Sequence, residues 1–372
     1  MARPYIDEEE EKLVIEVLRS GVLSIGPKID EFEEKFAELL GAKYACAVSN
    51  GTVGLHLALI ACGIKEGDEV ITSPFSFIAS ANAILYVGAK PIFADVDPLT
   101  FNIDPKEIEK KITPKTKAIL PVHIFGQSAD MGPIMAIASR NNLKVIEDAC
   151  ESVMAEYNGQ KVGTFGNASA FSFYPNKQMT TGEGGMITTN DEEIDSLCRS
   201  LRNQGRSENM QWLDHQIMGY NYRLTEVGAA LGIAQLKKLA SVIKKRREIA
   251  GWYGEEIKKY EDLLSAPETG AANTHTWFVY VARIRDPRID RDRVINKMAE
   301  FGIATKPYLP SIHLFDFYRK KFGFKNGDFP ISEAISNSSV ALPFYIELDK
   351  SDIEYICRKL AEAVKGSNIY RV

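Results

Sequence analysis

The sequence lacks the features that mark several classes of protein. Its cysteines, at positions 46, 62, 150, 198 and 357, form no C-x-x-C pair, so neither a disulfide framework nor a zinc site is predicted. There is no apolar run of roughly eighteen residues, which excludes a membrane-spanning helix. The acidic stretch from Asp7 to Glu11 leaves no room for a hydrophobic signal core. We therefore expect a protein of the reducing cytoplasm.

An excess of positive charge is also absent. The 372 residues include 45 Lys and Arg against 50 Asp and Glu, which gives a net charge of −5. Such a chain creates no global positive field that would attract nucleic acid or anionic lipid. Any anionic ligand must therefore be held by a local site. Hydrophobic residues at 45% and charged residues at 26% are ordinary globular values, which excludes a disordered or collagen-like chain.

Short apolar runs alternate with helical stretches between about residues 43 and 190. Most of these runs are continuously hydrophobic, which is typical of strands that are covered on both faces. The order of strand and helix predicts a mostly parallel seven-stranded sheet in a three-layer α/β/α domain. The candidate strands are 44–48, 69–72, 91–94, 118–122, 144–146, 170–173 and 186–189, and the candidate crossover helices are 53–62, 77–87, 131–141 and 192–202.

The last third of the chain has a different pattern. A long helical stretch follows Thr225 and runs into the basic residues 244–247, which we interpret as a solvated helical face rather than a nucleic-acid patch. Beyond it come one strand-like run, 277–284, and helices near 292–301 and 350–364. Because the length exceeds the usual size of one domain, we expect a large domain over 1–248 and a smaller α+β domain over 249–372.

Three segments carry residues suited to chemistry. In the segment 170–186, a strand delivers Lys177 into a turn, and a glycine-rich connection leads to the next strand. Asp148 ends an apolar strand, at the edge where open α/β sheets bind ligands. Gly51 and Thr52 lie where a strand and a small-residue turn lead into an apolar helix. The free backbone N–H groups at such a helix start can bind a phosphate.

Taken singly, each of these segments has an ordinary structural interpretation, because most lysines are solvated and a strand-end aspartate often caps a helix. Taken together, they supply an amine, a carboxylate and a phosphate cradle, which are the requirements of pyridoxal 5′-phosphate (PLP). The amine attaches to the aldehyde of PLP, and the carboxylate keeps the pyridine nitrogen protonated so that the ring can accept electrons. We therefore predict a PLP site.

The chain resembles the DegT/DnrJ/EryC1/StrS family of sugar aminotransferases, which have PLP fold type I. The resemblance extends over nearly the whole chain, in collinear order. The matching segments are Gly26-Pro27, Phe32-Glu33, Gly51-Thr52, 74–77, 95–97, 121–123, Glu147-Asp148, 170–186, 219–223 and 341–343.

The resemblance assigns roles to the residues that match. Lys177 would attach the cofactor and then move the substrate proton, and Asp148 would pair with the pyridine nitrogen. Glu151, where many relatives have glutamine, would lie near the ring hydroxyl of the cofactor. Phe77 would stack on the ring, and Gly51, Thr52 and Ser172 would hold the phosphate. His123 is expected to be a satisfied strand-end histidine without a catalytic role.

The resemblance also implies partners. Asn221 corresponds to a residue that reaches the phosphate from the neighbouring subunit, so we expect a homodimer with shared active sites. Tyr308 and His313 match a segment near the sugar-nucleotide site and are predicted to contact substrate. The family usually takes its amino group from glutamate.

These observations predict a PLP-dependent aminotransferase acting on a nucleotide-linked keto sugar, in ping-pong fashion. The segment 176–185 is similar to that of perosamine-synthase-like members, which favours amination at C4 of a 4-keto-6-deoxy sugar over amination at C3. A sugar dehydratase of the same fold is disfavoured because such enzymes replace the lysine with histidine. A non-catalytic regulator would be expected to lose Lys177 or Asp148, and an NAD-linked oxidoreductase would need a G-x-G-x-x-G segment that is absent. The nucleotide stays open.

Overall fold

A computed structural model gives the structure of residues 3–207 and 214–367. Its centre is a seven-stranded sheet in the order β1-β9-β8-β5-β4-β2-β3. Strands β8, β5, β4, β2 and β3 run parallel, whereas β9 pairs antiparallel with both β1 and β8. The strands are β1 (Tyr44–Val48), β2 (Glu69–Thr72), β3 (Lys90–Phe93), β4 (Thr116–Leu120), β5 (Lys144–Asp148), β8 (Ala168–Ser172) and β9 (Gly185–Thr189). The predicted mostly parallel sheet is confirmed.

Helices cover both faces of this sheet, because successive residues of its strands point to opposite sides. In β1, Cys46 and Val48 pack on one face and Ala45 and Ala47 on the other. The first face carries α3 (Gly51–Ala61), α4 (Ala79–Tyr86) and α7 (Glu192–Arg202). The opposite face carries α2 (Pro27–Leu40), α5 (Pro105–Glu109), α6 (Met131–Arg140) and the first half of α8 (Glu226–Lys258). The three-layer α/β/α arrangement is therefore also confirmed.

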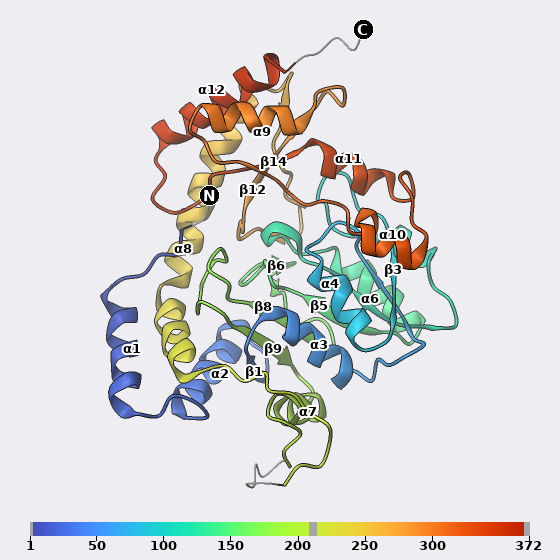
Figure 1. The fold of residues 1–372 in the computed structure, drawn as a ribbon, viewed down its shortest axis with the longest axis vertical. Helices are drawn as coiled ribbons and strands as arrows, with labels where there is room; N and C mark the ends of the chain where they lie inside the picture. The colour runs from blue at the N-terminus through green and yellow to red at the C-terminus, as the bar shows by residue number, and fades with distance from the viewer. Residues whose placement is uncertain (1–2, 208–213, 368–372) are drawn as a thin grey trace.

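The chain before the sheet packs against α8. Helix α1 (Glu8–Ser20) begins with a capping box in which Asp7 and Glu10 exchange side-chain and backbone hydrogen bonds. Its buried residues Leu13 and Val17 belong to the same core cluster as α8. In Figure 1, α1 lies beside the lower half of α8, and α8 then continues upward to α12.

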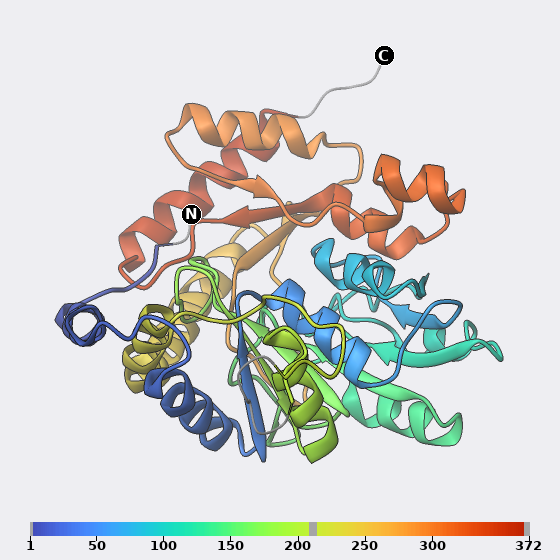
Figure 2. The same ribbon diagram turned by 60° about the horizontal axis from the view of Figure 1, so that its bottom comes forward.

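A second, smaller part of the molecule, with a sheet of its own, follows α8 in the chain. Its sheet has the order β10-β12-β14-β13 and is antiparallel throughout. The strands are β10 (Leu264–Ser265), β12 (Tyr280–Ile284), β13 (Lys306–Pro307) and β14 (Ser339–Leu342), and the helices are α9 (Arg291–Glu300), α10 (Asp316–Phe322), α11 (Pro330–Ser338) and α12 (Lys350–Lys365). Figure 2 shows α9 and α12 above this sheet, with the large sheet below it. A further small sheet consists of β6 (Glu156–Tyr157), β7 (Gln160–Lys161) and β11 (Asn273–Thr274).

Helix α8 joins the two parts of the molecule. It is unbroken over 33 residues and crosses the expected boundary at residue 249. Residues from Ala229 to Ile243 pack into the core beneath the large sheet, whereas Ile249, Tyr253 and Ile257 pack into the core of the smaller part. The division at 249 stays a prediction, since one continuous helix belongs to both cores. Among the described residues, no helix is long and apolar enough to cross a membrane.

Candidate active site

A cavity of about 620 Å³ opens at the carboxyl ends of the parallel strands. In an open α/β sheet this edge is where loops converge and ligands bind. Residues that follow β1, β2, β5 and β8 all line it, although they are far apart in the chain. Eight of the ten predicted site residues line the cavity: Gly51, Thr52, Phe77, Asp148, Glu151, Ser172, Lys177 and Tyr308.

Asp148 is the last residue of β5, and its carboxylate is held from two sides. Its Oδ1 accepts the Cys150 backbone N–H at 3.1 Å, and its Oδ2 accepts the Ser80 hydroxyl at 2.6 Å. Ser80 lies on α4, and its oxygen is 2.7 Å from that of Ser76. Because Ser80 has a single proton and directs it to Asp148, Ser76 can in turn donate to Ser80. These contacts fix the direction of the carboxyl group.

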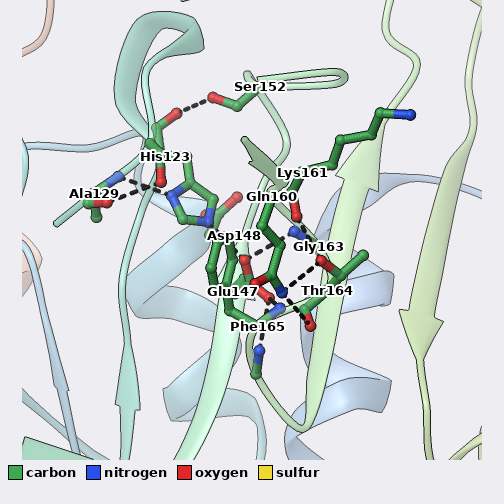
Figure 3. Close-up of polar contacts among 12 residues, drawn as sticks. His123, Ala129, Glu147, Asp148, Ser152, Gln160, Lys161, Gly163, Thr164 and Phe165 are labelled. Carbon is green, nitrogen blue, oxygen red and sulfur yellow. Dashed lines mark hydrogen bonds and ion pairs between the residues drawn. The ribbon is translucent and has the colours of Figure 1, made fainter. Parts of the chain in front are cut away.

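Glu147, the residue before Asp148, anchors the end of β5 beneath the site. It is fully buried and accepts the backbone N–H groups of Gly163, Phe165 and Gly166 at 2.8–2.9 Å (Figure 3). His123 Nε2 lies 3.0 Å from the same carboxylate, and His123 Nδ1 accepts the Ala129 N–H. The histidine therefore donates through Nε2, and both of its ring nitrogens are satisfied, as expected from the sequence.

Lys177 and Glu151 face one another across the cavity floor. Lys177 Nζ lies 3.6 Å from Glu151 Oε1, and the two side chains are only 13% and 7% exposed. Lys177 Nζ also lies 4.0 Å from the centre of the Phe278 ring. Glu151 is held in place because its Oε2 accepts the Phe125 N–H at 3.0 Å and its carbonyl accepts the Gln178 amide at 2.6 Å. The lysine loop and the end of β5 are thereby locked together.

Burial dominates the titration of this region. Loss of water raises the pKa of Glu151 above its ordinary value, and the nearby Lys177 cation only partly opposes that rise. The pKa of the Cys150 thiol is also raised, by burial and then by the neighbouring Asp148. Burial and then Glu151 raise the pKa of the Tyr308 phenol. Cys150 and Tyr308 are therefore neutral at physiological pH.

The start of α3 provides a cradle for an anion. The helix begins at Gly51, and the side chain of Asn50 accepts the Val53 N–H, so Gly51 and Thr52 have N–H groups with no partner inside the helix. A Cβ at Gly51 would lie 2.7 Å from Cys150 Sγ and 2.8 Å from Ser172 Cβ, so only glycine allows this close approach. Ser172, at the end of β8, completes the rim.

The residues present fit PLP. The cavity brings together a lysine amine, a carboxylate held by two donors, and a helix start with a serine beside it. Asn176 lines the same cavity, and its buried Oδ1 has no hydrogen-bond partner among the described residues, which indicates a polar partner that a ligand would supply. Phe77 lines the cavity and is 60% exposed, so its ring is available to stack on a ligand.

Two predicted site residues are placed elsewhere. His313 is completely buried in a short helical turn, where Nε2 lies 3.0 Å from Glu333 and its ring packs edge-on against Phe329. Burial lowers its pKa more than Glu333 raises it. Asn221 is exposed and does not line the cavity of its own chain, although the adjacent Tyr222 does. Their predicted roles stay predictions.

Sequence reasoning assigned no role to several residues that the fold brings into the site. Ser80 contacts Asp148, and Asn176, Tyr222 and Glu183 line the cavity. Ser76 and Ser80, spaced four residues apart at the start of an otherwise apolar helical stretch, were the one available signal for the first of these.

Known proteins resemble this chain along its whole length. It is 40% identical to "GDP-perosamine synthase" of Caulobacter vibrioides, covering 98% of each chain, and 40% identical to "Spore coat polysaccharide biosynthesis protein SpsC" of Bacillus subtilis, covering 98% of this chain and 97% of the relative. A solved structure, the PLP form of a putative sugar aminotransferase from Streptococcus pneumoniae, is 25% identical, covers 99% of each chain and superposes with a TM-score of 0.94. The model of the family described as "DegT/DnrJ/EryC1/StrS aminotransferase family" matches residues 4–361. The chain therefore belongs to this family of PLP-dependent sugar aminotransferases.

Proposed function

We propose that the protein transfers an amino group from glutamate to the C4 ketone of a nucleotide-linked 4-keto-6-deoxy sugar. Two observations support the substrate class: the similarity of the segment 176–185 to perosamine-synthase-like members, and the 40% identity to a protein named GDP-perosamine synthase over 98% of each chain. A cavity of about 620 Å³ has room for a cofactor together with a sugar ring.

The proposal depends most on one observation. Lys177, which lies in a loop, and Asp148, which ends β5, line the same cavity, and each is held there by buried contacts. A dehydratase or regulator of the same fold would not require this pair. Their joint presence is what amino transfer needs, because one group must carry a proton and the other must hold a charge.

When bound, PLP supplies an aldehyde for amine exchange and a ring that withdraws electrons from the reacting carbon. The protein supplies the rest. Asp148, fixed by Ser80 and the Cys150 N–H, would hold a proton on the ring nitrogen. Lys177 Nζ would move a proton between the substrate carbon and the cofactor. Gly51, Thr52 and Ser172 would bind the phosphate, and Phe77 would stack on the ring.

We further propose that the active protein is a homodimer. Asn221 is exposed and neighbours Tyr222, which lines the cavity, so the segment lies near the mouth of the site without closing it. Tyr220 and Tyr222 stack at 4.8 Å and form an aromatic surface at this position. In a dimer, Asn221 would contribute to the phosphate site of the partner. Size-exclusion chromatography with light scattering tests the oligomeric state, and the PLP affinity of Asn221→Ala, measured by equilibrium dialysis, tests the role of Asn221.

The deciding experiment incubates purified protein with PLP, glutamate and a panel of nucleotide-linked 3-keto and 4-keto sugars. Amino-sugar formation is followed by mass spectrometry. We expect a product from a 4-keto-6-deoxy sugar, with formation of 2-oxoglutarate. Product from 3-keto sugars alone would overturn the C4 assignment, and deoxygenated sugar without nitrogen transfer would overturn the reaction.

A further inference from the structure

The carboxyl group of Glu151 is held in place with one oxygen directed toward Lys177. Its Oε2 is already engaged by the Phe125 N–H, which fixes the carboxyl plane. Its Oε1 faces Lys177 Nζ at 3.6 Å. Lysine has a flexible four-carbon stem, so a small rotation brings the two atoms to hydrogen-bond distance.

The surroundings leave Lys177 few other partners for a proton. Asp148 is a nearby carboxylate, but both of its oxygens already accept hydrogen bonds, one from Ser80 and one from the Cys150 N–H. Cys150 and Tyr308 are neutral groups that do not compete as bases at physiological pH, because burial raises both pKa values. The centre of the Phe278 ring, which offers no proton acceptor of this kind, lies 4.0 Å from Nζ. Oε1 of Glu151 is therefore the available acceptor.

We propose that Glu151 and Lys177 share one proton, which moves between Lys177 Nζ and Glu151 Oε1 and lets the lysine become a neutral amine without releasing a proton to water. In this transfer an N–H bond breaks, an O–H bond forms, and the ammonium and carboxylate charges disappear together. The inference rests on the proposed role of Lys177 as the proton carrier.

The burial of the two side chains supports this transfer. Burial disfavours both charged forms, so the neutral pair is closer in free energy to the ion pair than it would be in water. The raised pKa of Glu151 has the same cause. A glutamine at this position could hydrogen-bond to the lysine but could accept no proton. The acid at position 151 therefore has a role that an amide cannot fill.

The test measures how the reactivity of Lys177 depends on pH in cofactor-free protein. Trace labelling with isotopic acetic anhydride, followed by peptide mass spectrometry, gives the fraction of neutral amine at Lys177 relative to the exposed Lys90. While the pair holds one proton, the division of that proton between the two atoms does not depend on pH. The wild-type rate should therefore reach a plateau as the pH falls. In Glu151→Gln the rate should keep falling by about tenfold per pH unit.

A matched control removes another acid from the same cavity. Glu183 lines the cavity but is exposed, so Glu183→Gln should keep the wild-type plateau. Glu151→Asp keeps the charge but shortens the reach to Nζ, and its plateau should be lower than that of the wild type. A wild-type curve that falls steadily with no plateau overturns the proposal, and it does so even if Glu151→Gln fails to fold.

Failure of this inference can be distinguished from failure of the proposed function. The labelling needs no cofactor and no turnover. If borohydride reduction of the PLP-loaded protein attaches the cofactor to Lys177 but the plateau is missing, only the shared proton is wrong. If the plateau is present but no amino sugar forms from any ketone, the pair exists and the proposed substrate reaction is wrong.

Discussion

Asp148 and Glu151 are two carboxylates three residues apart at the end of the same strand, and their surroundings differ. Asp148 accepts a serine hydroxyl and a backbone N–H, so each of its two oxygens is held by a donor. Glu151 accepts one N–H, faces a lysine, and has a pKa that burial raises. The contrast shows how one strand end can present two acids in different surroundings, because the neighbours of a carboxyl group and not its residue type decide how it is held.

Removal of the lysine should have the largest effect, since it removes the partner of Glu151 together with the attachment point of the cofactor. In Lys177→Ala we expect turnover to fall by at least about 10⁴-fold and the absorbance band of protein-attached PLP to disappear. Spectroscopy and the mass-spectrometric assay measure the two effects. Lys90→Ala, which removes an exposed lysine, serves as the control. An unchanged spectrum in Lys177→Ala would mean that another amine holds the cofactor.

Neutralising the other carboxylate should have the next largest effect. Asp148→Asn keeps the shape but replaces the carboxyl with a neutral amide, whose single oxygen can accept from Ser80 or from the Cys150 N–H but not from both. We expect turnover to fall by about 10²- to 10³-fold while the cofactor stays bound, because the ring would withdraw electrons less strongly. Equilibrium dialysis of PLP and steady-state rates separate binding from chemistry. Full activity would contradict the role of Asp148 as a fixed charge.

A smaller change sharpens the comparison without touching either carboxylate. Ser80→Ala removes a 2.6 Å hydrogen bond to an ionised group, which contributes about 1.5–3 kcal/mol. If the loss of this hydrogen bond raises the activation barrier by the same amount, turnover should fall by about 10- to 100-fold with little change in KM. Ser76→Ala, one step further from Asp148, should have a weaker effect. Equal effects of the two substitutions would indicate that Asp148 does not depend on the direct bond.

The sequence predicts much of this site because parallel strands end at a common edge. Lys177, Asp148 and Gly51 each follow an apolar run, and once these runs are taken as parallel strands, their ends must converge. The seven central strands were predicted for the same reason, since continuous apolar runs mark strands that are buried on both faces.

Contacts that depend on the packing of helices could not be predicted in this way. The bond from Ser80 to Asp148 exists because α4 packs over the end of β5, and no local pattern encodes that crossing. The two-residue strands β10 and β13 are too short to carry a period. The position of His313, buried against Phe329 and Glu333, also depends on tertiary packing, and its contact with substrate stays a prediction.

The smallest predicted effect is on stability, and it returns to Glu151. A carboxyl whose pKa is raised in the folded state binds its proton more tightly there, so it favours folding at low pH. That contribution is lost as the pH rises from the ordinary carboxyl pKa, about 4.5, through the raised value. Glu151→Gln carries no ionisable group. The stability of the variant relative to the wild type should therefore increase over that pH interval and level off above it.

Urea unfolding of the cofactor-free proteins across that interval measures the difference directly. Glu183→Gln removes an exposed carboxyl. Its free energy of unfolding, plotted against pH, should therefore run parallel to that of the wild type. If the free energy of unfolding of Glu151→Gln also changes with pH in parallel with that of the wild type, the Glu151 carboxyl has the same pKa in the folded and the unfolded chain. In that case burial would not distinguish Glu151 from a solvated acid. The contrast with Asp148 would then have to arise from hydrogen bonding alone.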